Sequence, residues 1–198
     1  MSFSNDFLNE SILIINQIDP AEIEKVTDVL AQVRADGGRL FVIGSGGGSG
    51  HASHAVCDFR KLCGFEAYAP YDNISELTAR VNDEGWDVSL VNWLKGSRIN
   101  SHDGVLVFSV GGGNFEKNIS PNIVRALEYA QQVNSKITGI VGKDGGYTKQ
   151  IGNAVVVIPV VNNSRITPHT EGFQALIWHL LVSHPKLQLN PTKWESTK

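Results

Sequence analysis

Four nearly continuous apolar runs constrain the fold of this 198-residue chain more than any other feature. They read RLFVIG at 39–44, GVLVFSV at 104–110, KITGIVG at 136–142 and NAVVVIPV at 153–160, and EAYAP at 66–70 is a weaker fifth. Strands that are buried on both faces read as unbroken apolar runs, because neither side of such a strand meets solvent. The runs therefore predict the strands of a parallel sheet.

Helical patterns separate or follow these runs, at roughly 51–63, 73–81, 121–133 and 169–183. Alternation of strands and helices is typical of α/β proteins, in which each helix carries the chain back to the next parallel strand. The sequence therefore predicts an α/β fold, a doubly wound, parallel, five-stranded sheet with helices on both faces. Ligands of such sheets bind at the carboxyl ends of the strands, near the point where the strand order reverses.

Two further helices precede the first strand. Apolar residues recur at helical spacing over residues 5–18, and Asp19-Pro20 ends that pattern and begins a second helix. The second helix has one apolar face and ends at Gly37-Gly38. We expect residues 1–36 to form an N-terminal helical arm, able to pack against another subunit, on an α/β core at 37–198. Because no linker or internal repeat divides the chain, we expect a single domain.

The composition argues against several classes of function. The formal net charge is −3, so no strongly basic surface indicates binding to nucleic acid. No apolar run approaches the roughly 18 residues that cross a bilayer, and the first residues lack the pattern of a signal peptide. Two cysteines, Cys57 and Cys63, do not make a disulfide framework. We therefore expect a cytoplasmic protein with no membrane or nucleic-acid partner.

A glycine-rich loop, GSGGGSGH at 44–51, joins the first strand to the helix after it. Free N–H groups and the helix dipole make such a helix start an anion site, and glycine lets the backbone approach the ligand closely. The loop lacks the Lys and Ser/Thr of the P-loop pattern, and Ser49 breaks the dinucleotide pattern GxGxxG. It is either an anion-binding loop or a tight turn that packs the helix against the strand.

A second loop, SVGGGNFEKNISPN at 109–122, also runs from a strand into a helix. Ser120 is a candidate N-cap, and Pro121 suits the first helical position. Two loops rich in Gly and Ser at the ends of two parallel strands favour one phosphate-bearing ligand held between them.

Histidines and a carboxylate share one face of the helix after the first loop. His51, His54 and Asp58 are spaced three and four residues apart, so they lie on the side that points toward the ligand. His54 and Asp58 can converge on one divalent metal or on one substrate atom. The residues alone equally allow a capping histidine and a solvated pair.

A second set lies in or near the last helix, where His169, Glu171 and His179 occur. In a continuous helix Glu171 and His179 are separated by about 12 Å of rise. That span is near the limit for sharing one metal, unless Glu171 lies at or before the first turn. His179, beside Trp178 in an apolar run, is alternatively a core or interface histidine.

Three motifs and the C-terminal helix carry a resemblance to a known family: GSGGGSGHASH at 44–54, LTARVNDEGW at 77–86 and GKDGG at 142–146. They look like the sugar isomerase (SIS) domain, and the likeness covers nearly the whole chain. The most similar branch is the phosphoheptose isomerases, which convert sedoheptulose 7-phosphate to glycero-manno-heptose 7-phosphate. The resemblance implies a flavodoxin-like sheet in a homotetramer, with active sites between subunits that often hold zinc.

In that family a His-x-x-x-Glu follows the first glycine loop, and the last helix carries Gln and His eight residues apart. His54 and Asp58 match the first pair, and Glu171 and His179 match the second. The resemblance therefore implies a divalent metal, with zinc as the expected ion, on His54, Asp58, Glu171 and His179. It also implies that Asp58 and His179 are catalytic, one as the base and the other as the acid. Two residue types differ from the family, because Asp replaces Glu and Glu replaces Gln.

The family's phosphate loop resembles Ser-Thr-Ser-Gly-Asn-Ser. Ser109 matches its first serine and Ser120 its last, but ten residues lie between them where the family has four, and the middle serine is lost. We expect both loops, and a polar pair after the helix at 73–81, to bind the sugar phosphate; the residues are Ser45, Gly46, Gly47, Gly48, Ser49, Ser109, Gly111, Gly112, Ser120, Asn82 and Asp83. Asn82 and Asp83 are alternatively a helix C-terminal cap. His51, where the family has an aspartate, has no assigned role.

Two other functions remain open on the sequence. An isomerase of a different sugar phosphate would explain the lengthened loop at 111–119, and a non-catalytic SIS module would bind a sugar phosphate as a sensor or act as a scaffold. A scaffold is expected to lose the histidine and carboxylate set, whereas this chain keeps His54 and His179. Double-SIS aminosugar synthases need two such domains, which 198 residues do not hold.

Overall fold

The computed structural model describes residues 2–193 as a five-stranded sheet with helices packed around it. In chain order the elements are α1 (Phe3–Gln17), α2 (Pro20–Ala35), β1 (Leu40–Gly44), α3 (Gly47–Cys63), β2 (Ala67–Tyr68), α4 (Ile74–Asp83), α5 (Trp86–Gly96), β3 (Gly104–Ser109), α6 (Pro121–Gln132), β4 (Lys136–Val141), α7 (Gly146–Ile151), β5 (Ala154–Val157), a 3-10 turn (Asn163–Arg165) and α8 (Ile166–Ser183).

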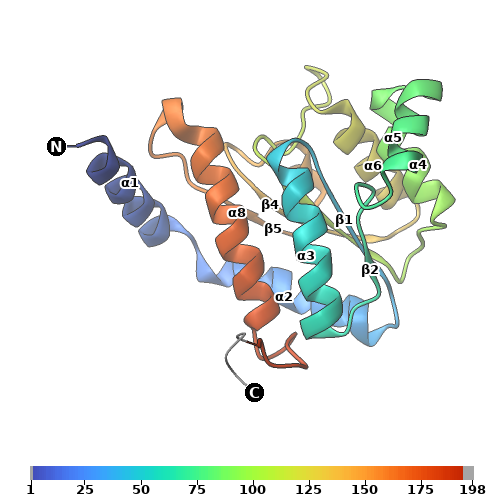
Figure 1. Cartoon of the computed structure of the whole chain (residues 1–198), viewed down its shortest axis with the longest axis horizontal. Helices are drawn as coiled ribbons and strands as arrows, with labels where there is room; N and C mark the ends of the chain where they lie inside the picture. The colour runs from blue at the N-terminus through green and yellow to red at the C-terminus, as the bar shows by residue number, and fades with distance from the viewer. Residues whose placement is uncertain (1, 194–198) are drawn as a thin grey trace.

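The strand order is β2-β1-β3-β4-β5, and every pairing is parallel (Figure 1). This confirms the predicted doubly wound, flavodoxin-like α/β fold. After β2 the chain returns to the other side of β1, so the order reverses between β1 and β3. Gly44 pairs with Phe108, which brings the carboxyl ends of these two strands to the same level. The two predicted ligand loops leave the sheet at this switch point.

Alternate residues of the strands enter two separate cores. On β1, Leu40 and Val42 join one cluster with α2, α3 and α8, whereas Phe41 and Ile43 join a second cluster with α5 and α6. Period-two alternation of this kind is what a strand covered on both faces requires. Figure 1 shows α3 and α8 side by side on the first face, and the two helices contact each other.

The structure contains two helices that the sequence analysis did not predict. Helix α5 buries Leu90, Trp93 and Leu94 at helical spacing, but its start at Gly85 has no side-chain cap. Helix α7 has only six residues, too few for a periodic pattern. Helices α3 and α8 also begin earlier than predicted, at Gly47 and Ile166.

The early start of α3 follows from close packing and not from helix propensity, since glycine disfavours a helix interior. A Cβ on Gly48 would lie 2.4 Å from the carbonyl oxygen of Phe108, so only glycine lets α3 approach the end of β3 this closely. Gly47 and Gly48 therefore belong to the first turn of α3, and the loop between β1 and α3 is reduced to Ser45 and Gly46.

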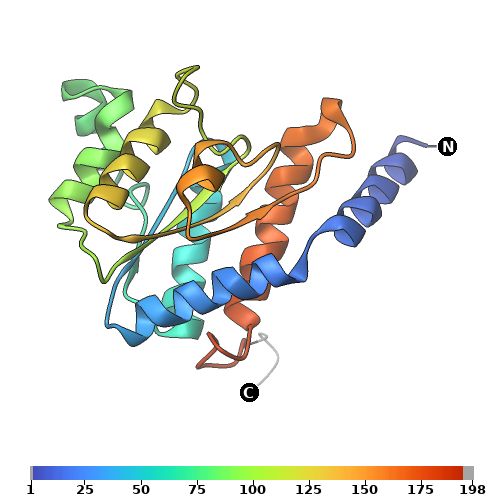
Figure 2. The ribbon, with the colours of Figure 1, turned by 180° about the vertical axis from the view of Figure 1, so that it is seen from behind.

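Of the predicted arm at 1–36, only α1 stands apart from the sheet, beside α8 (Figures 1 and 2). Helix α2 instead packs against β4 and β5 and buries Ile23, Val26, Leu30 and Val33 in the core, so this half of the arm belongs to the α/β core. Helix α1 buries only Ile14. Its main anchor is Glu10, whose carboxylate accepts hydrogen bonds from Arg165 and Asn162 and contacts His169 Nε2 at 2.8 Å. The hydrogen bond from Arg165 is the main reason that the pKa of Glu10 lies well below its usual range. Within residues 2–193 no helix is both long and apolar enough to cross a bilayer.

Candidate active site

The first loop is held tightly where β1 ends. The Tyr71 hydroxyl accepts a hydrogen bond from the Gly44 N–H at 2.9 Å and donates to the Gly44 carbonyl. Burial raises the pKa of Tyr71, which keeps the phenol neutral. The chain then turns at Gly46, whose φ of +57° suits glycine. The result is a fixed turn that leaves Ser45 half-buried at the carboxyl end of β1.

The second loop is held by hydrogen bonds between its own residues and α7. The Ser109 hydroxyl accepts from the Gly112 N–H at 3.0 Å. The Gly112 carbonyl in turn accepts from both the backbone N–H and the hydroxyl of Thr148, at 2.9 and 2.8 Å. Ser120 occupies the predicted N-cap position of α6, but its φ is +50° and its side chain makes no cap hydrogen bond. Its hydroxyl is therefore not used by the helix.

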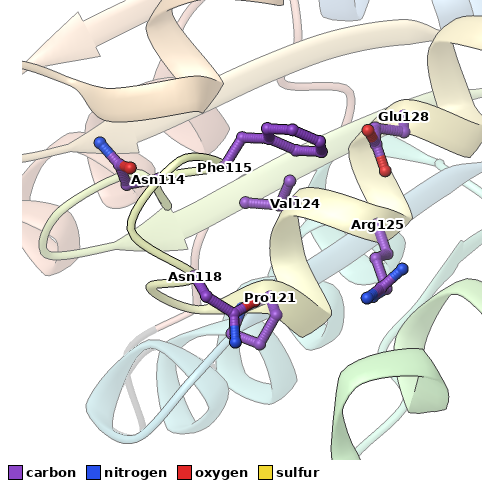
Figure 3. A pocket seen from close by; sticks show the side chains of 7 residues that line it. All are labelled: Asn114, Phe115, Asn118, Pro121, Val124, Arg125 and Glu128. Carbon is purple, nitrogen blue, oxygen red and sulfur yellow. The ribbon is translucent and has the colours of Figure 1, made fainter.

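The extra length of the second loop is a small hairpin. Asn114 and Ile119 exchange backbone hydrogen bonds of 2.9 and 3.0 Å, which close residues 114–119 into a turn. The hairpin leans on α6, and a cavity of about 190 Å³ lies between them (Figure 3). Without these six residues, four remain between Ser109 and Ser120, which is the length in the family pattern.

Three predicted site residues come together between α3 and α8. His54, Asp58 and His179 each present a ligand atom, and these atoms lie within 4.8 Å of one another. His54 Nε2 is 3.8 Å from an Asp58 carboxylate oxygen. His179 Nδ1 is 2.7 Å from the Ala175 carbonyl, to which it donates as N–H, so Nε2 is left to face the cluster.

Glu171 lies outside this group of three. It is in the second turn of α8, not at or before the first turn, so about 12 Å of rise separates it from His179. Its carboxylate lies against Gly47, where an added Cβ would be 2.6 Å from a carboxylate oxygen. The site of this negative charge is the amino end of α3, where the helix dipole favours an anion.

His51 lies near both Glu171 and the histidines of the other group, His54 and His179. Burial lowers its pKa, and the nearby charge of Glu171 acts in the opposite direction, whereas His54 and His179 lower the pKa further. Its ring stands edge-on to Phe108, with the centroids 6.1 Å apart. His51 is therefore held as a neutral imidazole near Glu171.

Asn82 and Asp83 form the exposed end of α4. The Asn82 amide donates to the Asp83 carboxylate at 2.8 Å, and within residues 2–193 no hydrogen bond joins either residue to the two glycine-containing loops. Their predicted contact with sugar hydroxyls remains a prediction.

The group of His54, Asp58 and His179 has the chemistry of a divalent-metal site. Two imidazoles and one carboxylate are the ligand types of catalytic zinc, which keeps a further position open for water or substrate. The carbonyl that accepts from His179 Nδ1 fixes the tautomer, as outer partners of metal-bound histidines commonly do. Several first-row divalent ions accept the same ligands.

Comparison with known proteins identifies relatives of the chain, although no family model matches it. The phosphoheptose isomerase of Trichlorobacter lovleyi is 30% identical over 166 residues, which cover 81% of this chain and 79% of that protein. The chain belongs to the phosphoheptose isomerase family. The lincomycin biosynthesis protein LmbN of Streptomyces lincolnensis is 25% identical over 195 residues, which cover 93% of this chain and 69% of that protein. Among solved structures, phosphoheptose isomerase GmhA from Neisseria gonorrhoeae superimposes with a TM-score of 0.78 at 19% identity, covering 91% of this chain and 96% of that one.

Two residues that the sequence analysis did not select hold side chains of the candidate site in place. Trp178 is buried, stacks on the His179 ring at 3.5 Å and stands edge-on to His54 at 4.6 Å, so it fixes both imidazoles. Asn122, in the first turn of α6, is fully buried and donates to the Ser45 hydroxyl at 3.2 Å. An aromatic residue before His179 was visible in the sequence, but nothing there indicated the contact of Asn122 with Ser45.

Proposed function

We propose that this chain interconverts sedoheptulose 7-phosphate and glycero-manno-heptose 7-phosphate as an aldose–ketose isomerase. The observation that carries the proposal is the convergence of His54, Asp58 and His179 at the helix that the first glycine loop opens. The phosphoheptose isomerase of T. lovleyi, at 30% identity, supports the same reaction.

The isomerisation moves one proton between C1 and C2 of the open-chain sugar and another between O1 and O2. Starting from the ketose, Asp58 takes the proton from C1, and that electron pair forms the C1–C2 double bond while the C2 oxygen takes a proton from His179 Nε2. Asp58 then returns its proton to C2, and the O1 proton passes to His179 as the aldehyde forms. The Ala175 carbonyl orients His179 for this role, because it occupies Nδ1.

His54, Asp58 and His179 would hold a divalent cation, for which zinc is the expected ion, and Glu171 remains the predicted fourth ligand. Because the Ala175 carbonyl occupies Nδ1 of His179, its Nε2 can either face the cation or carry the proton, so the acid role of His179 requires that the substrate takes its place at the cation. When bound, the cation would polarise the substrate carbonyl as a Lewis acid. Asp58 has two carboxylate oxygens, so one can face the cation while the other accepts the proton.

The substrate phosphate is expected at the second loop. The carboxylate of Glu171 occupies the space beside Gly47, and a phosphate there would meet a like charge. Gly111, in contrast, has no carboxylate against it, and a Cβ on Gly111 would meet only the Lys143 Cδ, at 3.9 Å. The hydroxyls of Ser109 and Ser120 supply further donors at this loop.

A homotetramer with active sites at the subunit interfaces is supported by exposed apolar side chains on α1 and α8. Leu8 and Ile12 on α1 are 62% and 54% exposed, and Leu176 and Leu180 on α8 are 51% and 40% exposed. An apolar cavity of about 290 Å³ lies between these two helices. Leu180 adjoins His179, so a partner subunit that covered this face would also enclose the site. The free cysteines, Cys57 and Cys63, suit the proposed cytoplasmic location.

The proposal is tested by measuring metal content and turnover of sedoheptulose 7-phosphate on the purified chain, with and without chelator. We expect bound metal, and activity that is lost on chelation and restored by zinc. His179→Ala should abolish turnover and reduce metal content, whereas His102→Ala, which removes an exposed imidazole at the opposite end of the sheet, should change neither. Metal that binds equally to wild type and His179→Ala would show that the cluster is not the metal site.

Trp178 supplies a second signal for metal binding that does not depend on activity. Because its ring stacks on His179, a bound ion should change its fluorescence. The change should be absent in Trp178→Phe and in His54→Ala. A change that persisted in both variants would place the ion elsewhere.

A second candidate function is the isomerisation of a different sugar phosphate. The hairpin at 114–119 favours it, because it adds residues to the loop that is expected to hold the phosphate. Bound metal without turnover of sedoheptulose 7-phosphate would support this candidate, whereas absence of both would favour a non-catalytic sugar-phosphate-binding protein.

A further inference from the structure

The two loops at the switch point are joined by one side-chain hydrogen bond. Asn122 lies in the first turn of α6, two residues after Ser120, and its side chain is fully buried. Its amide Nδ2 donates to the Ser45 hydroxyl, which belongs to the first loop and is only half-buried. Asn122 thus reaches from the loop that is expected to hold the phosphate to a half-buried hydroxyl at the carboxyl end of β1.

The direction of this hydrogen bond determines what Ser45 can offer to a ligand. A serine hydroxyl has one proton and two lone pairs. Because Ser45 accepts from Asn122, its proton is free to point away from the protein interior. A phosphate or a sugar oxygen at the carboxyl end of β1 needs such a donor, whereas a hydroxyl held in the opposite sense would present only lone pairs to it.

The other end of the same amide gives a second, independent observation. Within residues 2–193 the Asn122 carbonyl oxygen is buried and has no hydrogen-bond partner. A buried carbonyl without a partner destabilises a fold, so such groups are rare unless they have another role. Over residues 2–193 the protein alone therefore leaves this carbonyl oxygen unsatisfied.

We propose that Asn122 is a positioning residue that fixes the Ser45 hydroxyl as a hydrogen-bond donor to the sugar phosphate. The inference rests on the proposed function, because it assumes a phosphorylated substrate at the carboxyl end of β1. The inference adds Asn122, which the sequence analysis did not select. It also assigns the role of hydrogen-bond donor to Ser45, which the sequence analysis did select. Asn122 itself does not contact the substrate in this arrangement.

A double-mutant cycle tests the proposal. Ser45→Ala should raise KM for sedoheptulose 7-phosphate by roughly tenfold, since it removes a hydrogen bond to a charged group. Asn122→Ala should raise KM by roughly threefold to tenfold with little change in kcat, because the hydroxyl remains but loses its orientation. If Asn122 acts through Ser45, the double variant should have the KM of Ser45→Ala alone.

Asn122→Asp separates orientation from packing. An ionised carboxylate can only accept, so it would turn the Ser45 proton inward and raise KM more than Asn122→Ala does. Effects of the two alanine substitutions that multiply in the double variant would overturn the proposal. So would an Asn122→Ala protein whose melting temperature falls while its KM stays at the wild-type value, because that result describes a purely structural residue.

The same four proteins of the cycle also separate this inference from the proposed function. Wild-type turnover tests the function, and the dissociation constant for inorganic phosphate, measured by calorimetry, tests the positioning role without any reaction. If the wild type does not turn over the heptose phosphate but phosphate binding follows the same non-additive pattern, the inference stands and the substrate is wrong. If phosphate binding is unchanged in all three variants, the inference fails.

Discussion

Removal of the hairpin at 114–119 is the sharpest test of how the second loop is built. Asn114 and Ile119 are paired, and the Ser120 carbonyl is near Gly113, because a Cβ on Gly113 would lie 3.9 Å from it. Joining Gly113 directly to Ser120 should therefore need only a small adjustment, and glycine allows it. The deletion leaves Ser109, Gly112 and Ser120 in place.

Two opposing contributions determine the expected change in the free energy of unfolding when the hairpin is deleted. Shortening the segment between Ser109 and Ser120 from ten residues to four lowers the loop-closure cost by about 0.8 kcal/mol. Phe115 is 64% exposed, so its loss removes about 70 Å² of buried area from a side chain of about 200 Å². That area corresponds to about 2 kcal/mol. The net expectation is a loss of about 1 kcal/mol, or a decrease in Tm of roughly 2–4 °C.

Differential scanning fluorimetry checks the stability, and the KM for sedoheptulose 7-phosphate checks the site. We expect the KM to stay within about twofold of wild type, because the hydrogen bonds that hold Ser109 and Gly112 come from α7 and from the loop itself. A decrease in Tm beyond about 10 °C would refute the view that the hairpin is an appendage. A large increase in KM would show that the hairpin contacts the substrate.

Two other perturbations probe the fold around the site. Gly48→Ala should destabilise the protein by about 1–3 kcal/mol, because its Cβ would lie 2.4 Å from the Phe108 carbonyl oxygen. Gly50→Ala is the matched control, and it should be neutral or stabilising in thermal melts because its Cβ would have nothing within 4 Å. Equal effects of the two substitutions would contradict the close-packing argument. Glu10→Gln should lower Tm at neutral pH. The pKa of Glu10 is depressed in the folded state from an ordinary 4.5, so its stabilisation is complete above pH 4.5 and is lost as the pH falls below it. The Tm difference between wild type and variant should shrink in that acid range, and a difference that grew there would contradict the assignment.

The sheet was predictable because each strand is covered on both faces and therefore reads as an apolar run. Helix α5 was missed although Leu90, Trp93 and Leu94 have helical spacing, since Gly85 in front of it has no capping side chain. The start of α3 was not predictable from propensity, because its glycines form a helix only where β3 packs against them. The apolar runs of the strands can be seen in the local sequence, whereas the start of α3 depends on tertiary packing.

The convergence of His54 and Asp58 followed from their spacing of four residues on one helix, and His179 was added from the family resemblance. The structure brings these three together because α3 and α8 pack against each other on the same face of the sheet. The contact of Asn122 with Ser45 spans 77 positions and depends on the strand order, so no local pattern indicates it. The same holds for Glu171, whose place beside Gly47 depends on where α8 begins.

The position of Glu171 bears on whether the extra carboxylate of this chain serves the metal or the fold. At the amino end of α3 its carboxylate lies where the helix dipole favours a negative charge. Glu171→Gln restores the residue type of the family pattern and removes the charge next to the glycine loop. If Glu171 mainly stabilises the amino end of α3, Glu171→Gln should retain zinc, whereas His54→Ala should lose it. The KM of Glu171→Gln for the phosphorylated substrate should also fall, because the repulsion between the carboxylate and the phosphate is removed. A loss of zinc equal to that of His54→Ala would instead establish Glu171 as the fourth ligand, and would mean that its side chain moves toward His179 when the ion binds.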